Sequence, residues 1–167
     1  MTTTTKQDWL AAFNTLQQLS NELGVGDPFN YNRGREIHTA FILGLTVSDT
    51  LAGADAYDDK GPCELKSTIG KLKATYNGIS VQSSWDSQVD YIVNKKIGCY
   101  ANHYVVRYEG AKLVEAWRLS SDDVIAILLP KIKNQFNKPR GKDPRIGVQL
   151  TAKEIQTFGE LIYDESN

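Results

Sequence analysis

The stretch ADAYDDKGPCELKS, residues 54–67, predicts a β-hairpin around which the other elements can be arranged. Residues 58–61, Asp-Asp-Lys-Gly, have the chemistry of a tight turn and separate two short arms. Residues two apart on a strand share one face of the sheet. Glu64 and Lys66 should therefore point together, while Cys63 and Leu65 point the other way into the core.

Asp55 lies on the arm before the turn, and the hairpin folds that arm back so that Asp55 can reach the Glu64 side of the sheet. Two carboxylates and a lysine would then converge. This grouping suits phosphodiester hydrolysis, because two carboxylate oxygens and a backbone carbonyl bind Mg²⁺ and a lysine can orient or activate the attacking water. The same pattern also occurs on ordinary solvated hairpin surfaces, and this alternative stays open here.

Helices are predicted from apolar residues that recur at three- and four-residue steps. The predicted helices are Gln7–Leu23, about Arg33 to Leu43 with Asn32 as its cap, and a third that begins after Ser120 or Ser121 and that Pro130 kinks or ends. The first helix carries an apolar stripe made of Trp9, Leu10, Phe13, Leu16, Leu19 and Leu23. That stripe is either a core face or a subunit interface.

A second hairpin is predicted where β-branched and aromatic residues dominate two arms, Tyr104–Tyr108 and Lys112–Leu119. Further extended segments are predicted at Ile79–Val81, Tyr91–Val93 and Ile146–Leu150, and the chain ends in a short helix or strand. Helices that flank a mixed, largely central sheet define an α/β or α+β class. Without an internal repeat or a linker, the 167 residues are expected to form a single domain.

The net charge is −1, from 19 lysines and arginines against 20 acidic residues, which excludes a strongly basic DNA-coating protein. Basic residues still gather in three segments: Arg33 and Arg35, the polar run Ser67–Ser80 with Lys71 and Lys73, and a loop predicted over Lys131–Arg145. The last segment holds Lys131, Lys133, Lys138, Arg140, Lys142 and Arg145. Each alone is typical of a solvated face, whereas the three together favour one nucleic-acid-binding face.

No apolar run approaches the roughly 20 residues of a membrane span, and the threonine-rich start lacks the apolar stretch of a signal peptide. We therefore expect a cytoplasmic protein with no membrane partner. Cys63 and Cys99 are too few for a disulfide framework and are expected to be buried apolar residues. His38 and His103 lie far apart with no cysteine neighbours, so a structural zinc site is not expected.

Several segments resemble the PvuII-like type II restriction endonucleases of the PD-(D/E)xK nuclease superfamily. They are Gly44–Val47, Gly53–Asp58, Gly61, Glu64–Ser67, Gly78–Ser80, Tyr104–Leu119 and Asp143–Val148. The similarity runs in order through nearly the whole chain. The opening helix also resembles the dimerisation helix of that family, so residues 7–23 are the expected dimer contact.

The resemblance implies a restriction-endonuclease-like fold, with a mixed central sheet flanked by helices, and a homodimeric, Mg²⁺-dependent enzyme that cuts double-stranded DNA. By position, Asp55 and Glu64 look like the metal-binding carboxylates, Lys66 like the catalytic lysine, and the Leu65 carbonyl like a further metal ligand. Glu36 is the candidate for an accessory acid, a role that helix glutamates have in some nucleases of this superfamily.

The sequence also departs from that family. Ala52 and Ala54 replace an acidic residue and the proline of the motif name, and Val81–Ser84 replaces a histidine-rich base-reading segment. The last change predicts a different target sequence, since glutamine is suited to bidentate contact with adenine. The residues expected to contact DNA are Asn32, Lys71, Ser80, Gln82, Ser83, Ser84, Lys142 and Arg145.

The favoured function is that of a type II restriction enzyme, which cuts both strands of a short palindromic site. A second hypothesis is another PD-(D/E)xK nuclease, such as a homing, repair or junction-resolving enzyme, with the same active site and a different substrate. A third is a non-catalytic DNA-binding protein, in which the acidic cluster only caps a sheet and binds no metal.

Overall fold

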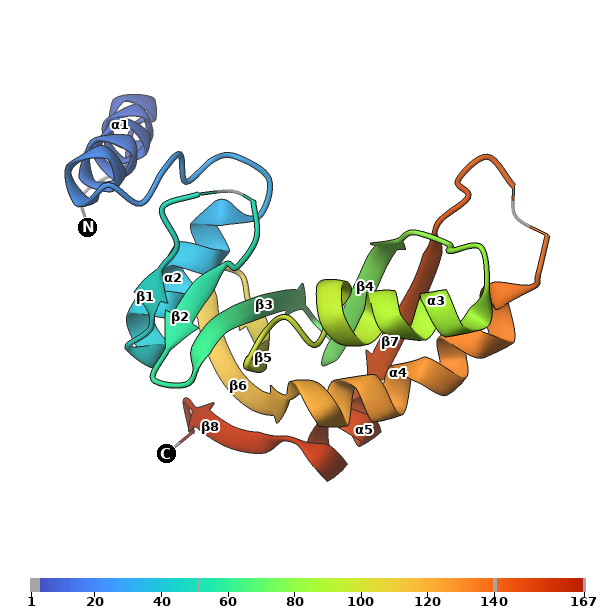
Figure 1. The fold of residues 1–167 in the computed structure, drawn as a ribbon. Coiled ribbons are helices and arrows are strands. Elements are labelled where there is room, and N and C mark those ends of the chain that lie inside the picture. The colour runs from blue at the N-terminus through green and yellow to red at the C-terminus, as the bar shows by residue number, and fades with distance from the viewer. Residues whose placement is uncertain (1–3, 51, 140, 167) are drawn as a thin grey trace.

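The computed structural model describes residues 4–50, 52–139 and 141–166. Within these residues two sheets form an α+β fold with helices packed around them, as the sequence predicts (Figure 1). The larger sheet has the spatial order β1 (Thr46–Val47), β2 (Ala56–Asp58), β3 (Gly61–Ile69), β5 (Asn102–Glu109), β6 (Lys112–Ser120) and β8 (Glu160–Asp164). The smaller sheet pairs β4 (Lys73–Ile79) with β7 (Ile146–Thr151).

The helices are α1 (Lys6–Leu23), α2 (Arg33–Leu43), α3 (Trp85–Tyr91), α4 (Ser121–Phe136) and α5 (Ala152–Phe158), with a π-helical turn η1 (Ile92–Lys96) directly after α3. Three of them agree closely with the predicted helices, including the cap of α4, where the Ser120 hydroxyl accepts from the Asp123 backbone N–H. The sequence prediction missed α3. Tyr91–Val93 was predicted to be extended but is helical. Ile92 lies where α3 meets η1, and its side chain is fully buried in the core.

The hairpin at residues 54–67 forms as predicted. β2 and β3 pair antiparallel, with Ala56 opposite Cys63. The Asp58 carboxylate closes the turn by accepting from the backbone N–H groups of Lys60 at 2.8 Å and Gly61 at 3.0 Å. β3 then continues beside β5 in parallel, so the hairpin is built into the centre of the larger sheet.

Three apolar cores of described residues hold the sheets in place, and one of them consists of Val106, Tyr108, Leu113 and Ala116 on β5 and β6. The larger core lies between the small sheet and the helices that cover it, and its fully buried members include Ile79, Ile92, Leu128, Ile132 and Leu150. A smaller core lies under α2 and consists of Ala40, Ala56, Cys63, Leu65 and Tyr104. The alternation predicted for β3 is therefore confirmed, because its inward residues join this smaller core.

Helix α4 continues through Pro130 to Phe136, so the prediction that a loop begins at Lys131 is wrong. Leu128 and Ile132 are both fully buried on either side of the proline, and their packing outweighs its local cost. The run Ser67–Ser80 likewise consists mainly of the end of β3 and the strand β4. Arg140, part of the predicted basic loop, lies outside the described residues.

Two further predictions about individual residues are wrong. Arg33 was expected on a basic face, but it is only 2% exposed. Its guanidinium donates to the backbone carbonyls of Val25 and Ser48 and lies 3.6 Å from the Glu36 carboxylate, so it anchors the chain before α2. Cys99, expected in the core, is exposed.

The apolar stripe of α1 does not face the core of its own chain. Trp9 is 61% exposed and Phe13 is 41% exposed, and Leu10, Leu16, Leu19 and Leu23 are also exposed. Figure 1 shows α1 at the end of the molecule that lies away from the small sheet. The core-face alternative is therefore wrong. Among the described residues, no helix combines the length and the apolar character needed to span a membrane.

Candidate active site

A polar pocket of about 340 Å³ opens where the central hairpin meets α2 and β4. It is lined by Asn32, Glu36, Asp55, Glu64, Leu65, Lys66, Ser67, Thr68, Lys73 and Thr75. The predicted catalytic group, the predicted accessory acid and one predicted DNA-contacting residue thus line one pocket. Lys73 and Thr75 are site residues that the sequence analysis missed, and their alternation with the buried Ala74 and Tyr76 on β4 is the signal that places both on one face.

Hydrogen bonds orient the acidic residues of the pocket. The Asp55 carboxylate accepts from the Leu65 backbone N–H at 2.8 Å, which fixes it beside β3. The Lys66 ammonium forms an ion pair with the Glu64 carboxylate from the same face of β3. This face is only partly exposed, at 17% for the Glu64 side chain and 25% for that of Lys66, so the pair is not a freely solvated surface pair.

The carboxylates repel one another across the pocket. Burial, together with the charges of Glu64 and Glu36, raises the pKa of Asp55 to about 7, even though the Leu65 N–H acts to lower it. Burial also raises the pKa of Glu36, against the charge of Arg33, and the Glu64 charge contributes to the rise. A cation held between these oxygens would relieve the repulsion.

The donor set agrees with a hard divalent cation. Within the described part of the chain, no group of three or more His, Cys, Asp or Glu side chains is placed to hold a metal ion. Mg²⁺ does not need such a cage, because it keeps several waters and binds through one or two carboxylates. Asp55 and Glu64, with Leu65 beside them in the lining, provide that number of carboxylates.

Asn32 precedes α2 and enters the pocket from that side. It is the N-cap residue of α2, as predicted, but its side chain makes no capping bond and donates to the Ser67 hydroxyl at 3.0 Å. It therefore links the start of α2 to the strand that carries Glu64 and Lys66. Its neighbour Tyr31 is fully exposed and adopts a positive φ of 47°.

The predicted base-reading segment connects β4 to α3 and does not line this pocket. Ser80 and Ser83 are exposed, and the Ser84 hydroxyl caps α3 by accepting from the Ser87 N–H at 3.1 Å. The Gln82 side-chain amide donates to the Ser80 carbonyl at 3.2 Å. The fully buried Gln88, which the sequence analysis missed, organises the segment by accepting from the Gln82 backbone N–H.

The remaining predicted DNA contacts are also exposed and lie outside the pocket. Lys71 occupies the turn between β3 and β4, and Lys142 and Arg145 lie just before β7. The Arg145 guanidinium is held by the Asp143 carboxylate through two parallel hydrogen bonds of 2.9 Å each. These residues precede the two strands of the small sheet, β4 and β7, and Figure 1 shows this sheet at the end of the molecule away from α1.

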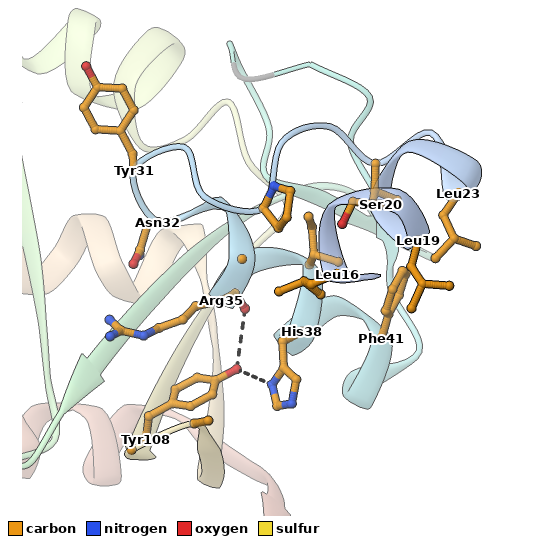
Figure 2. Close-up of a pocket in the computed structure, with 16 residues that line it drawn as sticks. Leu16, Leu19, Ser20, Leu23, Tyr31, Asn32, Arg35, His38, Phe41 and Tyr108 are labelled. Carbon is orange, nitrogen blue, oxygen red and sulfur yellow. Dashed lines mark hydrogen bonds between the residues drawn. The ribbon is translucent and has the colours of Figure 1, made fainter. Parts of the chain in front are cut away.

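A larger pocket, of about 640 Å³, has a different character. It is mainly apolar and lies between α1 and α2, with Leu16, Leu19, Phe41 and Tyr108 in its lining (Figure 2). The Tyr108 hydroxyl is held there by the His38 ring at 2.8 Å and by the Arg35 carbonyl at 3.5 Å. Asp55, Glu64 and Lys66 do not line it, so the candidate catalytic residues belong to the smaller, polar pocket alone.

Comparison of the sequence with protein-family models and with curated proteins gave no match.

Proposed function

We propose that this protein is a Mg²⁺-dependent endonuclease that cuts double-stranded DNA at a short palindromic site, as type II restriction enzymes do. One observation carries the proposal: Asp55, Glu64 and Lys66 line a single pocket, with both carboxylates partly buried against the same strand. A solvated hairpin surface would not hold the pKa of an aspartate near 7.

In this proposal the carboxylates of Asp55 and Glu64 and the backbone carbonyl of Leu65 hold the cation. When bound, Mg²⁺ neutralises negative charge on the phosphate and makes a coordinated water more acidic. Lys66 orients the attacking water and places a positive charge beside the reacting phosphate. Glu36 shapes the field of the pocket as an accessory acid from α2.

The surroundings of the pocket support a nucleic-acid substrate. Lys73 and the hydroxyls of Ser67 and Thr75 line it and can donate to phosphate oxygens. Other exposed basic residues are Lys71 on the β3–β4 turn and Lys142 and Arg145 before β7. Asn32, Ser80, Gln82, Ser83 and Ser84 complete the proposed DNA contacts. We expect the enzyme to act in the cytosol, where it meets DNA.

A homodimer is part of the same proposal. The stripe on α1 exposes Trp9, Phe13 and Leu16 at the helix surface, and exposed apolar surface of this kind is typical of a subunit contact. A two-fold symmetric dimer would present one active centre to each strand of a palindrome.

Digestion of phage DNA with the purified protein in Mg²⁺ tests the proposal. We expect discrete bands with Mg²⁺ and no cutting in EDTA or with Asp55→Ala. Cutting restricted to branched DNA would favour a junction-resolving enzyme instead. DNA binding without any cutting in Mg²⁺ or Mn²⁺ would favour the non-catalytic DNA-binding protein and refute the enzyme.

A further inference from the structure

The aromatic ring of Tyr76 lies next to the lysine of the candidate active site. The Lys66 ammonium lies over this ring, 5.5 Å from its centroid, which is within the range of a cation–π contact. Tyr76 comes from β4, only 5% of it is exposed, and it belongs to the larger core, so its ring meets Lys66 from the core side and does not line the pocket. We propose that Tyr76 is a positioning residue, whose ring holds the Lys66 ammonium at the reacting phosphate. This inference rests on the proposed nuclease function.

The orientation of the Tyr76 ring is fixed by a buried hydrogen-bond network. Its hydroxyl lies 3.1 Å from Nδ1 of His103, a fully buried residue on β5. Nε2 of the same ring lies 3.3 Å from the Ile97 carbonyl and 3.1 Å from the Ser121 hydroxyl. A carbonyl can only accept, so Nε2 carries the proton and Nδ1 accepts from the tyrosine hydroxyl.

The network also joins the pocket to the body of the protein. His103 sits directly opposite Glu64 in the register of β3 and β5. Ser121, which begins α4, in turn donates to the backbone carbonyl of Tyr100. Burial lowers the pKa of His103 to about 4, so its ring stays neutral and adds no competing positive charge near Lys66.

A rigid ring at this position has a specific use. Lys66 is held by two attractions, the Glu64 carboxylate and the Tyr76 ring face. In the proposed function Glu64 would also bind the cation, and its attraction for the Lys66 ammonium would then be weaker. The Tyr76 ring is held by its hydrogen bond to His103 and does not move. Its attraction therefore keeps the Lys66 ammonium in place when the Glu64 carboxylate also binds the cation.

Two substitutions at Tyr76 separate the ring from the hydroxyl. On a duplex that carries a site mapped in the wild-type digest, Tyr76→Leu should lower kcat about ten-fold with KM changed less than about two-fold, since a partly desolvated cation–π contact is lost. Tyr76→Phe keeps the ring and should retain kcat within about two-fold. Tyr108→Leu is the matched control, because Tyr108 is equally buried and also bonded to a histidine, His38, outside the pocket.

A second measurement does not depend on activity. In the NMR spectrum of the metal-free wild type, the ring current of Tyr76 should shift the ε-CH₂ protons of Lys66 upfield, and Tyr76→Phe should keep this shift. If the wild type lacks this shift, the inference is wrong even if the protein cleaves DNA. The inference is also wrong if Tyr76→Leu and Tyr108→Leu lose kcat equally. If the shift is present but the wild type makes no cut, the proposed function fails while the Lys66–Tyr76 contact stands.

Discussion

The Asp55 carboxylate accepts a hydrogen bond from the Leu65 backbone N–H across a separation of ten residues. The Asp55 backbone is held as well, because its N–H donates to the Cys63 carbonyl at 3.0 Å and its carbonyl accepts from the Ser48 N–H at 3.1 Å. Sheet pairing therefore extends one residue beyond the start of β2. Asp55 is thus held by the backbone groups of Cys63 and Leu65, on either side of Glu64. Its position therefore depends little on flexible surface structure.

The first prediction concerns the two carboxylates. Asp55→Asn or Glu64→Gln should abolish cleavage, by about 1,000-fold or more, because each removes charge that the reaction needs around the phosphate. DNA binding without metal should persist or tighten, since a negative charge facing phosphate is lost. Single-turnover cleavage and gel-shift titrations measure the two effects separately.

Asp58→Asn is the matched control for that experiment. The Asp58 carboxylate lies in the same hairpin and accepts from the Asn102 amide at 2.6 Å and the Tyr104 hydroxyl at 2.8 Å. Burial alone would raise the pKa of Asp58, but these hydrogen bonds lower it to about 2. This variant should lower the melting temperature and retain cleavage. Near-normal turnover in either active-site variant would remove Asp55 or Glu64 from the mechanism.

The second prediction is a pH dependence of stability in the absence of metal. The pKa of Asp55 is about 7 in the folded protein, against an ordinary value of 3.8. Between these values the folded state keeps a proton that the unfolded state has lost, so the free energy of unfolding falls as pH rises from about 4 to about 7. Asp55→Asn has no carboxylate to ionise, so its free energy of unfolding should not fall in this way. It should therefore be more stable than the wild type at pH 8.

Urea unfolding in EDTA at pH 5 and pH 8 measures this effect, with an expected difference on the order of a few kcal/mol. Adding Mg²⁺ at pH 8 should stabilise the wild type but not Asp55→Asn, because the cation binds the ionised carboxylate. Equal stability of the two proteins at both pH values would show that Asp55 is not the repelled carboxylate.

The third prediction concerns assembly. Phe13→Asp or Leu16→Asp places a charge in the stripe of α1 and should convert a dimer into a monomer while leaving the fold of each chain intact. Gln18→Glu adds the same charge to the same helix on the side opposite Trp9, away from the stripe, and should leave the dimer unchanged. Sedimentation velocity, with circular dichroism as a check on folding, distinguishes the variants. A wild type that stays monomeric even with DNA would contradict the proposal.

The fourth prediction separates base reading from phosphate binding. Gln82→Ala should reduce the preference for cognate over scrambled duplex, by about 1–3 kcal/mol for a lost base contact. The Gln82 amide donates one N–H to the Ser80 carbonyl, which leaves its second N–H and its carbonyl oxygen for a base. Lys71→Ala should instead weaken binding to all sequences and reduce the salt dependence by roughly one ion.

Competition binding on both duplexes across a salt series provides the measurement. An unchanged ratio of cognate to scrambled binding in Gln82→Ala would move the base-reading role to Lys142 and Arg145, the exposed residues before β7. A preference lost in Lys71→Ala would likewise exclude a purely electrostatic role for that lysine.

The sequence by itself determined the local geometry of the site. Turn chemistry at 58–61 and strand alternation require only near neighbours, so the pairing of Glu64 with Lys66 and the return of Asp55 could be predicted from residues 54–67. The same holds for the helix at Lys6–Leu23, whose capping box and apolar periodicity are local, although periodicity could not say which surface covers the stripe.

Only the tertiary structure decided what surrounds that local geometry. Tyr76 and His103 are 27 residues apart in the sequence, and their side chains meet only in the folded chain. No local sequence pattern predicts this contact. Arg33 is buried by two backbone carbonyls that come from segments before and after α2, and α4 passes through Pro130 because core packing repays its cost. Local propensities fix turns and alternation, whereas burial and partners depend on contacts between distant segments, and these exist only once the chain has folded.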